Sequence, residues 1–357
     1  MKSRIVGLLI LIAVIAAGIV IYFMNGGGRP APTMLKGFIG GEKEGFFEDA
    51  GVKELLQKKY GLKLDYAKAG SIDMARTPGD SDFLFPSSQI ALEIYKGTQG
   101  NPLVRSEPIF NSPLVIYSWD TVTDALVKQG IVEEKNGVYS ITDFSKLVQW
   151  TIEGKKWADV GLTDLYGSIK INTTDPAKSN SGNMFFALLA GMLNHGEVVD
   201  NNTLWKVLPQ LKGYYYRLGY MEDSSSKLFD AYLTKGVGEQ PMIAGYENQI
   251  IEFAAQNPEQ WNSIGSRIRI LYPVPTIWSS HILITVKDQA AELARALTDA
   301  EAQKIAWERH GFRSGVTGTV NDPKSVMVPG IAEKTDMVMP MPRAEVVEKI
   351  LEDLQQQ

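Results

Sequence analysis

The sequence predicts an α/β protein with a parallel sheet, preceded by a single transmembrane helix. Its 357 residues are 44% hydrophobic and 22% charged, which is the composition of a globular chain of about two domains. Residues 34–66 have the pattern strand, helix, strand, which favours parallel pairing of the two strands. Loops that follow a strand and begin a helix then recur four times along the chain.

The first element is an apolar run from Ile5 to Met24, which follows the cations Lys2 and Arg4. As a helix it spans roughly 30 Å, enough for the core of a bilayer. The cations are expected to stay in the cytoplasm, so the rest of the chain lies outside. We therefore expect residues 1–24 to be a single-pass anchor in the inner membrane, with the body on the periplasmic side. A cleaved signal peptide is the alternative, although its apolar stretch is usually only about 7–15 residues long.

A flexible stem, rich in glycine and proline, is expected at residues 25–32. Beyond it, short apolar or alternating runs bounded by turn residues predict the strands: 34–39, 62–66, 82–85, 113–119, 166–172, 241–246, 267–272 and 280–286. Helical periodicity predicts the helices: 43–60, 89–96, 184–193, 227–235, 247–256, 290–309 (as one helix or two) and 343–354.

Composition excludes several kinds of function. The chain has no cysteine, so disulfides, thiolate zinc sites and iron–sulfur clusters are excluded. A formal charge of −5 gives no bulk attraction for nucleic acid. His195, His281 and His310 lie far apart, and no nucleophile–base motif is recognisable. We therefore expect a binding protein without catalytic residues, metal or cofactor, and not an enzyme.

The four strand-to-helix loops are the candidate site: residues 40–43, 86–88, 179–182 and 246–248. The first turn of a helix has unpaired N–H groups and the positive end of the helix dipole, so it binds anions. In open α/β sheets, ligands lie at the carboxyl ends of the strands. Serine and asparagine in these loops are alternatively explained as ordinary N-caps.

Three segments resemble the bacterial extracellular solute-binding proteins of the type-II periplasmic-binding-protein fold. They are the loop 174–182 before an apolar helix, the strand and loop 241–249, and the helix 300–306 that leads to His310-Gly311-Phe312-Arg313. Together they place the resemblance over residues 34–315. The molybdate-, sulfate- and phosphate-binding branch is the most similar.

This resemblance implies two α/β lobes joined by hinge strands at 113–117 and 271–276. Lobe 1 would comprise 33–115 and 277–320, and lobe 2 would comprise 116–276. The ligand would lie between the lobes, which would close around it. The implied ligand-binding residues are Gly41, Glu42, Ser71, Ser87, Ser88, Ser179, Asn180, Ser181, Tyr246 and Glu247.

Glu42 departs from this pattern, because a carboxylate repels an oxyanion by roughly 4 kcal/mol at 4 Å. Either Glu42 points away from the ligand, or the ligand is a cationic or hydroxyl-rich organic molecule. The resemblance implies a membrane-anchored receptor that delivers a small solute to an ABC-type permease, and its oxyanion-binding branch implies an oxyanion as that solute. The alternative is an envelope sensory or scaffolding module that binds a protein partner.

The segment 321–357 extends past the expected end of the fold. It carries Met337, Met339 and Met341 between prolines. We expect this segment to pack on lobe 1 as a strap. The alternative is that its methionines form an adaptable surface that binds a partner.

Overall fold

The computed structural model describes residues 12–18, 31–335 and 337–355. The strands are β1 (Thr33–Ile39), β2 (Leu62–Lys68), β3 (Phe83–Phe85), β4 (Arg105–Trp119), β5 (Val132–Lys135), β6 (Val138–Ile141), β7 (Met242–Tyr246), β8 (Ile268–Pro273), β9 (Trp278–Thr285) and β10 (Arg313–Ser314). The helices are α2 (Glu44–Glu48), α3 (Ala50–Glu54), α4 (Ser71–Arg76), α5 (Gln89–Gly97), α6 (Asp120–Lys128), α7 (Phe144–Glu153), α8 (Asn180–Leu193), α9 (Leu204–Leu218), α10 (Ser225–Lys235), α11 (Glu247–Gln256), α12 (Pro258–Ile264), α13 (Ala291–Leu297), α14 (Ala300–His310) and α15 (Ala344–Gln355).

The described strands form one mixed sheet in the order β2-β1-β3-β9-β4-β8-β6-β5, and β7 and β10 also pair with β4. Pairing is parallel where β1 meets β2 and β3, and where β6 meets β8. The other pairs are antiparallel. The expected parallel sheet is therefore wrong for most of the strands. The reason is that β9, from late in the chain, is inserted between β3 and β4 and runs antiparallel to both.

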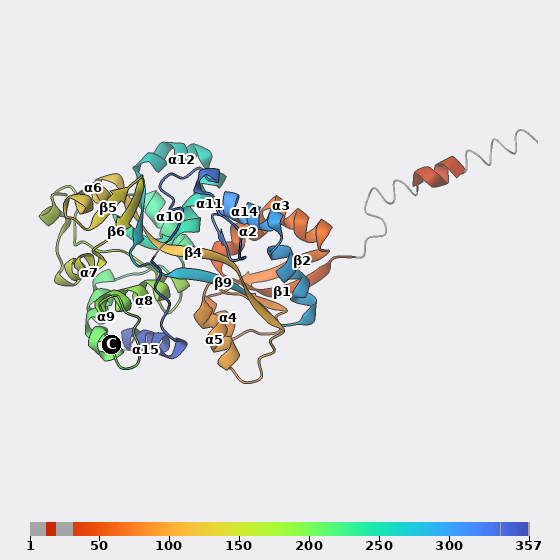
Figure 1. Ribbon diagram of the computed structural model, residues 1–357, viewed down its shortest axis with the longest axis horizontal. Helices are drawn as coiled ribbons and strands as arrows, with labels where there is room; N and C mark the ends of the chain where they lie inside the picture. Colours follow the sequence, from red (N-terminus) through yellow and green to blue (C-terminus); the bar gives the residue numbers. More distant parts are fainter. Residues whose placement is uncertain (1–11, 19–30, 336, 356–357) are drawn as a thin grey trace, which may run out of the picture.

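Strand β4 divides the molecule into two lobes, which Figure 1 shows side by side. Its first part, residues 105–113, pairs with β9, and residues 114–119 pair with β7 and β8. We call the half with β1, β2, β3, β9 and β10 lobe 1, and the half with β5, β6, β7 and β8 lobe 2. The chain returns from lobe 2 to lobe 1 through the short connection from β8 to β9.

Each lobe has its own core. In lobe 1, the ring of Phe110 packs 5.0 Å from the rings of both Phe46 and Phe312, centroid to centroid. In lobe 2, α8 lies inside the core, with the side chains from Ser181 to Met192 buried. A helix that is apolar on all sides is stable only when it is covered on all sides, and β7 together with α7 and α9 surrounds it.

The predicted anchor lies mostly outside the described residues. Residues 12–18 form a helix whose side chains are exposed, and the remainder of the run from Ile5 to Met24 is not described. Among the described residues, no helix has the length and apolar character needed to span a membrane.

The C-terminal segment, residues 321–355 without 336, packs mainly on lobe 2 and also contacts lobe 1, so the expected strap on lobe 1 is only part of its packing. On lobe 1, Glu348 pairs with Arg76, and Trp307 Nε1 donates to Asp322 O at 3.0 Å and to Ser325 Oγ at 2.9 Å. Met339 and the α15 side chains Val346 and Ile350 are buried in the lobe 2 core. The segment also runs beside the connection between β8 and β9, where Thr276 N donates to Met337 O at 3.0 Å and Met339 N donates to Thr276 O at 2.8 Å.

The predicted strand 166–172 is wrong. In this stretch only Ser168 and Asn172 make isolated bridge pairs. Ile169 and Ile171 are buried, but Tyr166 is 93% exposed, so only part of the stretch has the alternating buried face that favours a strand.

Candidate functional site

A cavity of about 590 Å³ lies between the two lobes, a volume typical of small-molecule sites. Lobe 1 lines it with residues 40–42 after β1 and with residues 68–71 between β2 and α4. Lobe 2 lines it with the residues at the starts of α8, α10 and α11. The predicted residues Gly41, Glu42, Ser71, Ser179, Asn180 and Tyr246 all line this cavity.

Two long helices begin at the cavity wall. α8 starts after Ser179, and α10 starts after Ser224, whose hydroxyl accepts a bond from Lys227 N at 3.4 Å. Ser225 and Ser226 add two hydroxyls at the same place. Unpaired N–H groups and hydroxyls are donors without a full charge, so this wall of the cavity favours an anion.

The charged side chains around the cavity balance one another. Three lysines line it, and each forms an ion pair with a carboxylate: Lys68 with Glu44 at 2.8 Å, Lys178 with Asp175 at 3.3 Å, and Lys227 with Asp223 at 2.7 Å. These pairs are largely exposed and hold their side chains only weakly. The lysines therefore remain able to turn toward an anion in the cavity.

Glu42 is neutralised from beneath by Lys43, which is completely buried. The Lys43 ammonium donates to Glu42 Oε1 at 2.5 Å, to Ser87 Oγ at 2.6 Å and to His281 Nδ1 at 3.0 Å. All three of its N–H donors are thereby satisfied. The carboxylate that sequence analysis identified as an obstacle to anion binding thus belongs to a closed ion pair.

The Lys43 ammonium also determines the protonation of His281. Because Nδ1 of His281 accepts from Lys43, its proton lies on Nε2, which faces Ser279 Oγ at 3.4 Å. Burial and the Lys43 charge together lower the pKa of His281 from 6.5 to about 4. Burial alone raises the pKa of Glu42, but Lys43 and His281 outweigh burial and hold that pKa well below its ordinary value of 4.5.

Lowering the pH from 6.5 to 4 is expected to destabilise the protein through His281. The unfolded chain takes up a proton at His281 near pH 6.5, whereas the folded chain stays neutral there down to about pH 4. The unfolded state binds more protons in this window, so the free energy of unfolding falls as the pH falls, by up to about tenfold in the equilibrium constant per pH unit. Urea unfolding between pH 7 and pH 4 measures this effect. A His281→Gln variant should show a shallower decline, and parallel curves for the two proteins would contradict the assignment.

Asn180 joins the lobes at the cavity. Its Nδ2 donates to Ser87 O of lobe 1 at 2.9 Å and to Tyr246 OH of lobe 2 at 3.0 Å. Close packing accompanies this contact. A Cβ on Gly70 of lobe 1 would lie only 3.1 Å from Lys178 O of lobe 2. The lobes are therefore closed upon each other along this edge of the cavity.

Four predicted residues do not line the cavity. Ser87 is buried beneath it, against Lys43 and Glu42, and the Ser88 hydroxyl caps α5 by accepting from Ile90 N at 3.2 Å. Ser181 is fully buried and bonds to the hydroxyl of Thr174 at 2.8 Å.

Glu247 is the fourth of these residues and has a structural role. It is completely buried and accepts two bonds from Arg313, from Nε at 2.6 Å and from Nη2 at 2.8 Å. Tyr272 OH donates to the same carboxylate at 2.5 Å. Arg313 follows Gly311, which ends α14 with a φ of +68° and turns the chain toward Glu247. Glu247 therefore joins the two lobes and does not face the cavity.

Sequence reasoning missed several residues of this region. The run Asp223-Ser224-Ser225-Ser226-Lys227 before a helix carried a visible signal, since serine and aspartate begin helices. The pairing of Ser87 with Lys43 carried none, because the two residues are 44 positions apart. This serine–lysine pair lies inside the protein, where the Ser87 hydroxyl also donates to Glu42.

No protein-family model matches the chain, and no curated protein sequence matches it. Several solved structures match most of the length of this chain. The periplasmic binding protein AfuA from Actinobacillus pleuropneumoniae, with exogenous fructose-6-phosphate bound, is 14% identical, and the match covers 91% of this chain and 99% of AfuA with a TM-score of 0.55. Iron-bound HitA from Pseudomonas aeruginosa is 11% identical, and the match covers 91% of this chain and 100% of HitA with a TM-score of 0.58.

The sulfate-binding protein SubI from Mycobacterium tuberculosis is 13% identical, and the match covers 88% of this chain and 96% of SubI with a TM-score of 0.52. These three proteins bind different solutes, so at these identities the likeness concerns the fold. The chain has the two-lobe α/β fold of the type-II periplasmic solute-binding proteins, which is the fold that its sequence motifs predicted.

Proposed function

We propose that the protein captures a small anionic solute between its lobes and delivers it to an ABC-type permease. The observation that carries this proposal is the cavity of about 590 Å³ at which the N-termini of α8 and α10 meet. Helix N-termini stabilise anions through their free N–H groups and their dipoles. Lys68, Lys178 and Lys227 supply mobile cations around the same cavity.

The buried Lys43 removes the objection that Glu42 posed to an anion. Glu42 lines the cavity but is paired with Lys43 and accepts from Ser87. An ion pair presents a dipole in place of a full negative charge, so the repulsion of roughly 4 kcal/mol does not arise. This arrangement supports the anionic solute over a cationic one.

The protein is proposed to bind its solute without turning it over. The pair that most resembles a catalytic dyad, Ser87 with Lys43, is fully buried and engaged with Glu42 and His281. A nucleophile must reach its substrate, and this hydroxyl does not line the cavity. Binding followed by lobe opening is the cycle that the fold supports.

The proposed location is the inner membrane, with the two lobes on the periplasmic side. The support is the apolar run from Ile5 to Met24 that follows Lys2 and Arg4. A tether of this kind keeps a receptor close to its permease and raises the effective concentration of the pair.

The test is a thermal-shift panel on the full-length protein in detergent micelles, followed by calorimetry. The panel contains phosphate, sulfate, molybdate, organic phosphates, carboxylates, amino acids, polyamines and sugars. A solute at about 100 times its dissociation constant adds roughly 2.7 kcal/mol of stability. An anion is expected to raise the melting temperature. Shifts with polyamines alone would overturn the anionic solute, and no shift at all would favour the sensory or scaffolding alternative.

An Asn180→Ala variant is expected to bind its anion about 5–10-fold more weakly, because the hydrogen bonds that join the lobes at this edge are lost. Titration calorimetry measures the affinity. The matched control is Asn194→Ala, at the other end of α8, where the amide donates to Glu197 O. Equal losses in the two variants would show that the effect does not come from lobe closure.

A further inference from the structure

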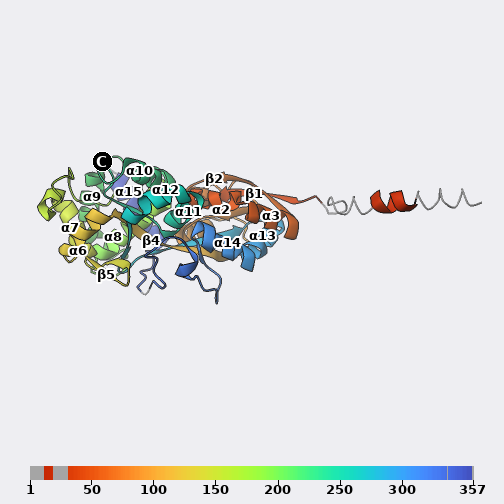
Figure 2. The same ribbon diagram turned by 90° about the horizontal axis from the view of Figure 1, so that it is seen from above.

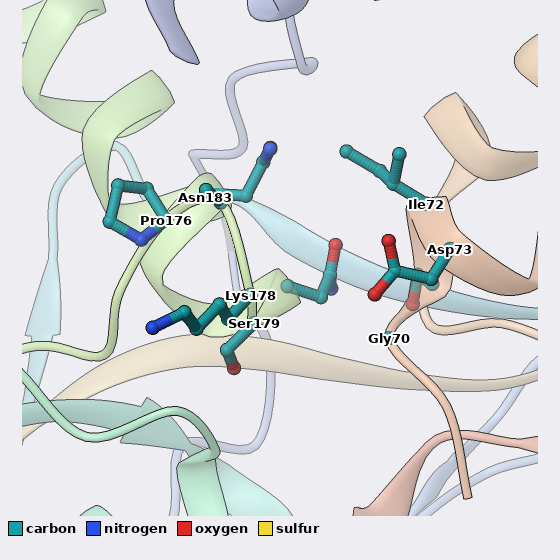
Figure 3. A pocket seen from close by; sticks show the side chains of 10 residues that line it. Gly70, Ile72, Asp73, Pro176, Lys178, Ser179 and Asn183 are labelled. Atoms are coloured by element: carbon teal, nitrogen blue, oxygen red, sulfur yellow. The ribbon is translucent and has the colours of Figure 1, made fainter. Parts of the chain in front are cut away.

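A small hollow lies beside the cavity, toward α4. It is lined from lobe 1 by Ile72 and Asp73, and from lobe 2 by Pro176 and Asn183. Its remaining lining residues, from 70–71 and 177–180, mostly line the main cavity as well, so the two spaces are neighbours. The volume of the hollow is about 10 Å³, which is room for about one oxygen-sized group. Figure 3 shows the two lobes facing each other across it.

Asn183 presents an unpaired donor at this hollow. The residue is only 4% exposed, and its Nδ2 is buried without a hydrogen-bond partner among the described residues. In Figure 3 the amide extends from α8 toward the side of Ile72. Buried amide groups are almost always hydrogen-bonded, because an unpaired one loses its bonds to water and gains none. The structure therefore provides a place for an acceptor next to Asn183.

Asp73 presents an acceptor from the opposite lobe. Its carboxylate is directed across the hollow toward lobe 2 (Figure 3). Among the described residues it forms no ion pair, and Lys178, the cation nearest in the lining, pairs with Asp175. An ionised carboxylate only accepts hydrogen bonds. Asp73 is exposed and water can reach its carboxylate, so the demand on an occupant of the hollow comes from the buried Asn183. A group that accepts from Asn183 and donates to Asp73 would engage both lobes.

We propose that this hollow binds an alcohol hydroxyl of the solute, so that the captured solute is a hydroxylated organic anion. The proposal rests on the anion site between α8 and α10. A hydroxyl both donates and accepts, so it satisfies Asp73 and Asn183 together. A fully ionised inorganic oxyanion only accepts and is repelled by Asp73. An ammonium group only donates and leaves Asn183 unpaired.

The placement of the two residues also connects this contact to lobe closure. Asp73 belongs to lobe 1 and Asn183 to lobe 2, so the hollow exists only while the lobes are together. A hydroxyl held by both residues links the lobes directly. Solutes with a hydroxyl at the correct distance from the anionic group thus close the protein, and simple oxyanions lack this link.

The experiment is calorimetric titration of the full-length protein in detergent micelles with three probes: sulfate, which only accepts hydrogen bonds, glycerol 3-phosphate and gluconate. The variants are Asp73→Ala and Asn183→Leu, and the control is Asp124→Ala, which removes an exposed carboxylate from α6. Asp73 is exposed, so its variant is expected to fold even if Asn183→Leu does not.

Glycerol 3-phosphate or gluconate is expected to bind at least tenfold more tightly than sulfate to the unaltered protein. Asp73→Ala should weaken the hydroxylated probe about tenfold and should not weaken sulfate, because it removes a negative charge near the anion. If Asp73→Ala and the control behave alike, or if sulfate binds as tightly as the organic anions, the hollow holds only water and this proposal is wrong. Failure of all three probes to bind would overturn the anion site itself.

Discussion

A Lys43→Met variant is expected to lose about 3 kcal/mol of its free energy of unfolding, because it leaves the Glu42 carboxylate, which is only 9% exposed, without its cation. Methionine is close to lysine in size, so the change removes charge more than volume. The carboxylate keeps only the Ser87 hydroxyl and the neighbouring His281 ring, whose Nδ1 lies 3.5 Å from Glu42 Oε1. Urea unfolding at pH 7 measures the loss.

The variant should also weaken the pH dependence associated with His281. In the unaltered protein, burial and the Lys43 charge both oppose protonation of His281. Without that charge, burial still opposes the imidazolium but Glu42 favours it, so the folded pKa of His281 moves up from about 4 toward the unfolded value of 6.5. The free energy of unfolding should then fall less steeply between pH 6.5 and pH 4 than in the unaltered protein. A double variant, Glu42→Gln with Lys43→Met, removes both charges and should lose much less stability. A single variant as stable as the unaltered protein would contradict the ion pair.

An Arg313→Met variant is expected to lose a similar amount, about 3–5 kcal/mol, because Glu247 is completely buried. Arg313 also donates to Ala332 O at 2.5 Å and to Glu333 O at 3.3 Å. The substitution therefore releases the C-terminal segment at residues 332–333 in addition to leaving Glu247 unpaired. Chemical unfolding measures the stability, and limited proteolysis detects the released segment.

The matched control for this variant is Arg309→Met, four residues earlier. Arg309 pairs with Asp49 at 3.1 Å, but its side chain is 56% exposed. An exposed pair contributes at most about 1 kcal/mol, so this variant should unfold almost like the unaltered protein. Equal losses in the two variants would show that burial of Glu247 is not the cause.

The elements that sequence predicted best are those with strong local signals. The strand 241–246 and the helix 247–256 were expected within one residue of β7 and α11, because a buried apolar run meets a helical period at that point. The hairpin of β5 and β6 has a comparable local signal, although these two strands were not among those predicted from the sequence. Asn136 and Gly137 have φ values of 56° and 81°, and an Asn-Gly pair between alternating strands indicates a two-residue hairpin turn.

The chemistry of the site was less predictable, because it depends on contacts between distant residues. Lys43 stands beside Glu42 in the sequence, yet its burial requires Ser87 and His281, which are 44 and 238 positions away. Lysine is normally exposed, so no local pattern predicts a buried one. Glu247 was expected in the site for the same reason, since its partner Arg313 is 66 positions away.

The mixed topology of the sheet was also unpredictable, because it depends on pairing between strands that are distant in the sequence. β9 reaches its place between β3 and β4 after nearly two hundred intervening residues. Figure 2 shows α11 of lobe 2 and α14 of lobe 1 near each other in the middle of the view, and these helices are in contact. Local patterns predicted both helices, but the insertion of β9 between β3 and β4 leaves no trace in nearby sequence.

The segment that runs beside the connection between β8 and β9 offers two backbone reporters of the proposed lobe opening. Thr276 N and Met339 N are each bonded across this pair of chain segments. If the lobes open by bending at this connection, as we propose, the segments separate and both amides become exposed to solvent. Exchange of an amide proton for deuterium follows the population of such open states. The protection factors of these two amides would then measure the bending, residue by residue and without any label on the protein.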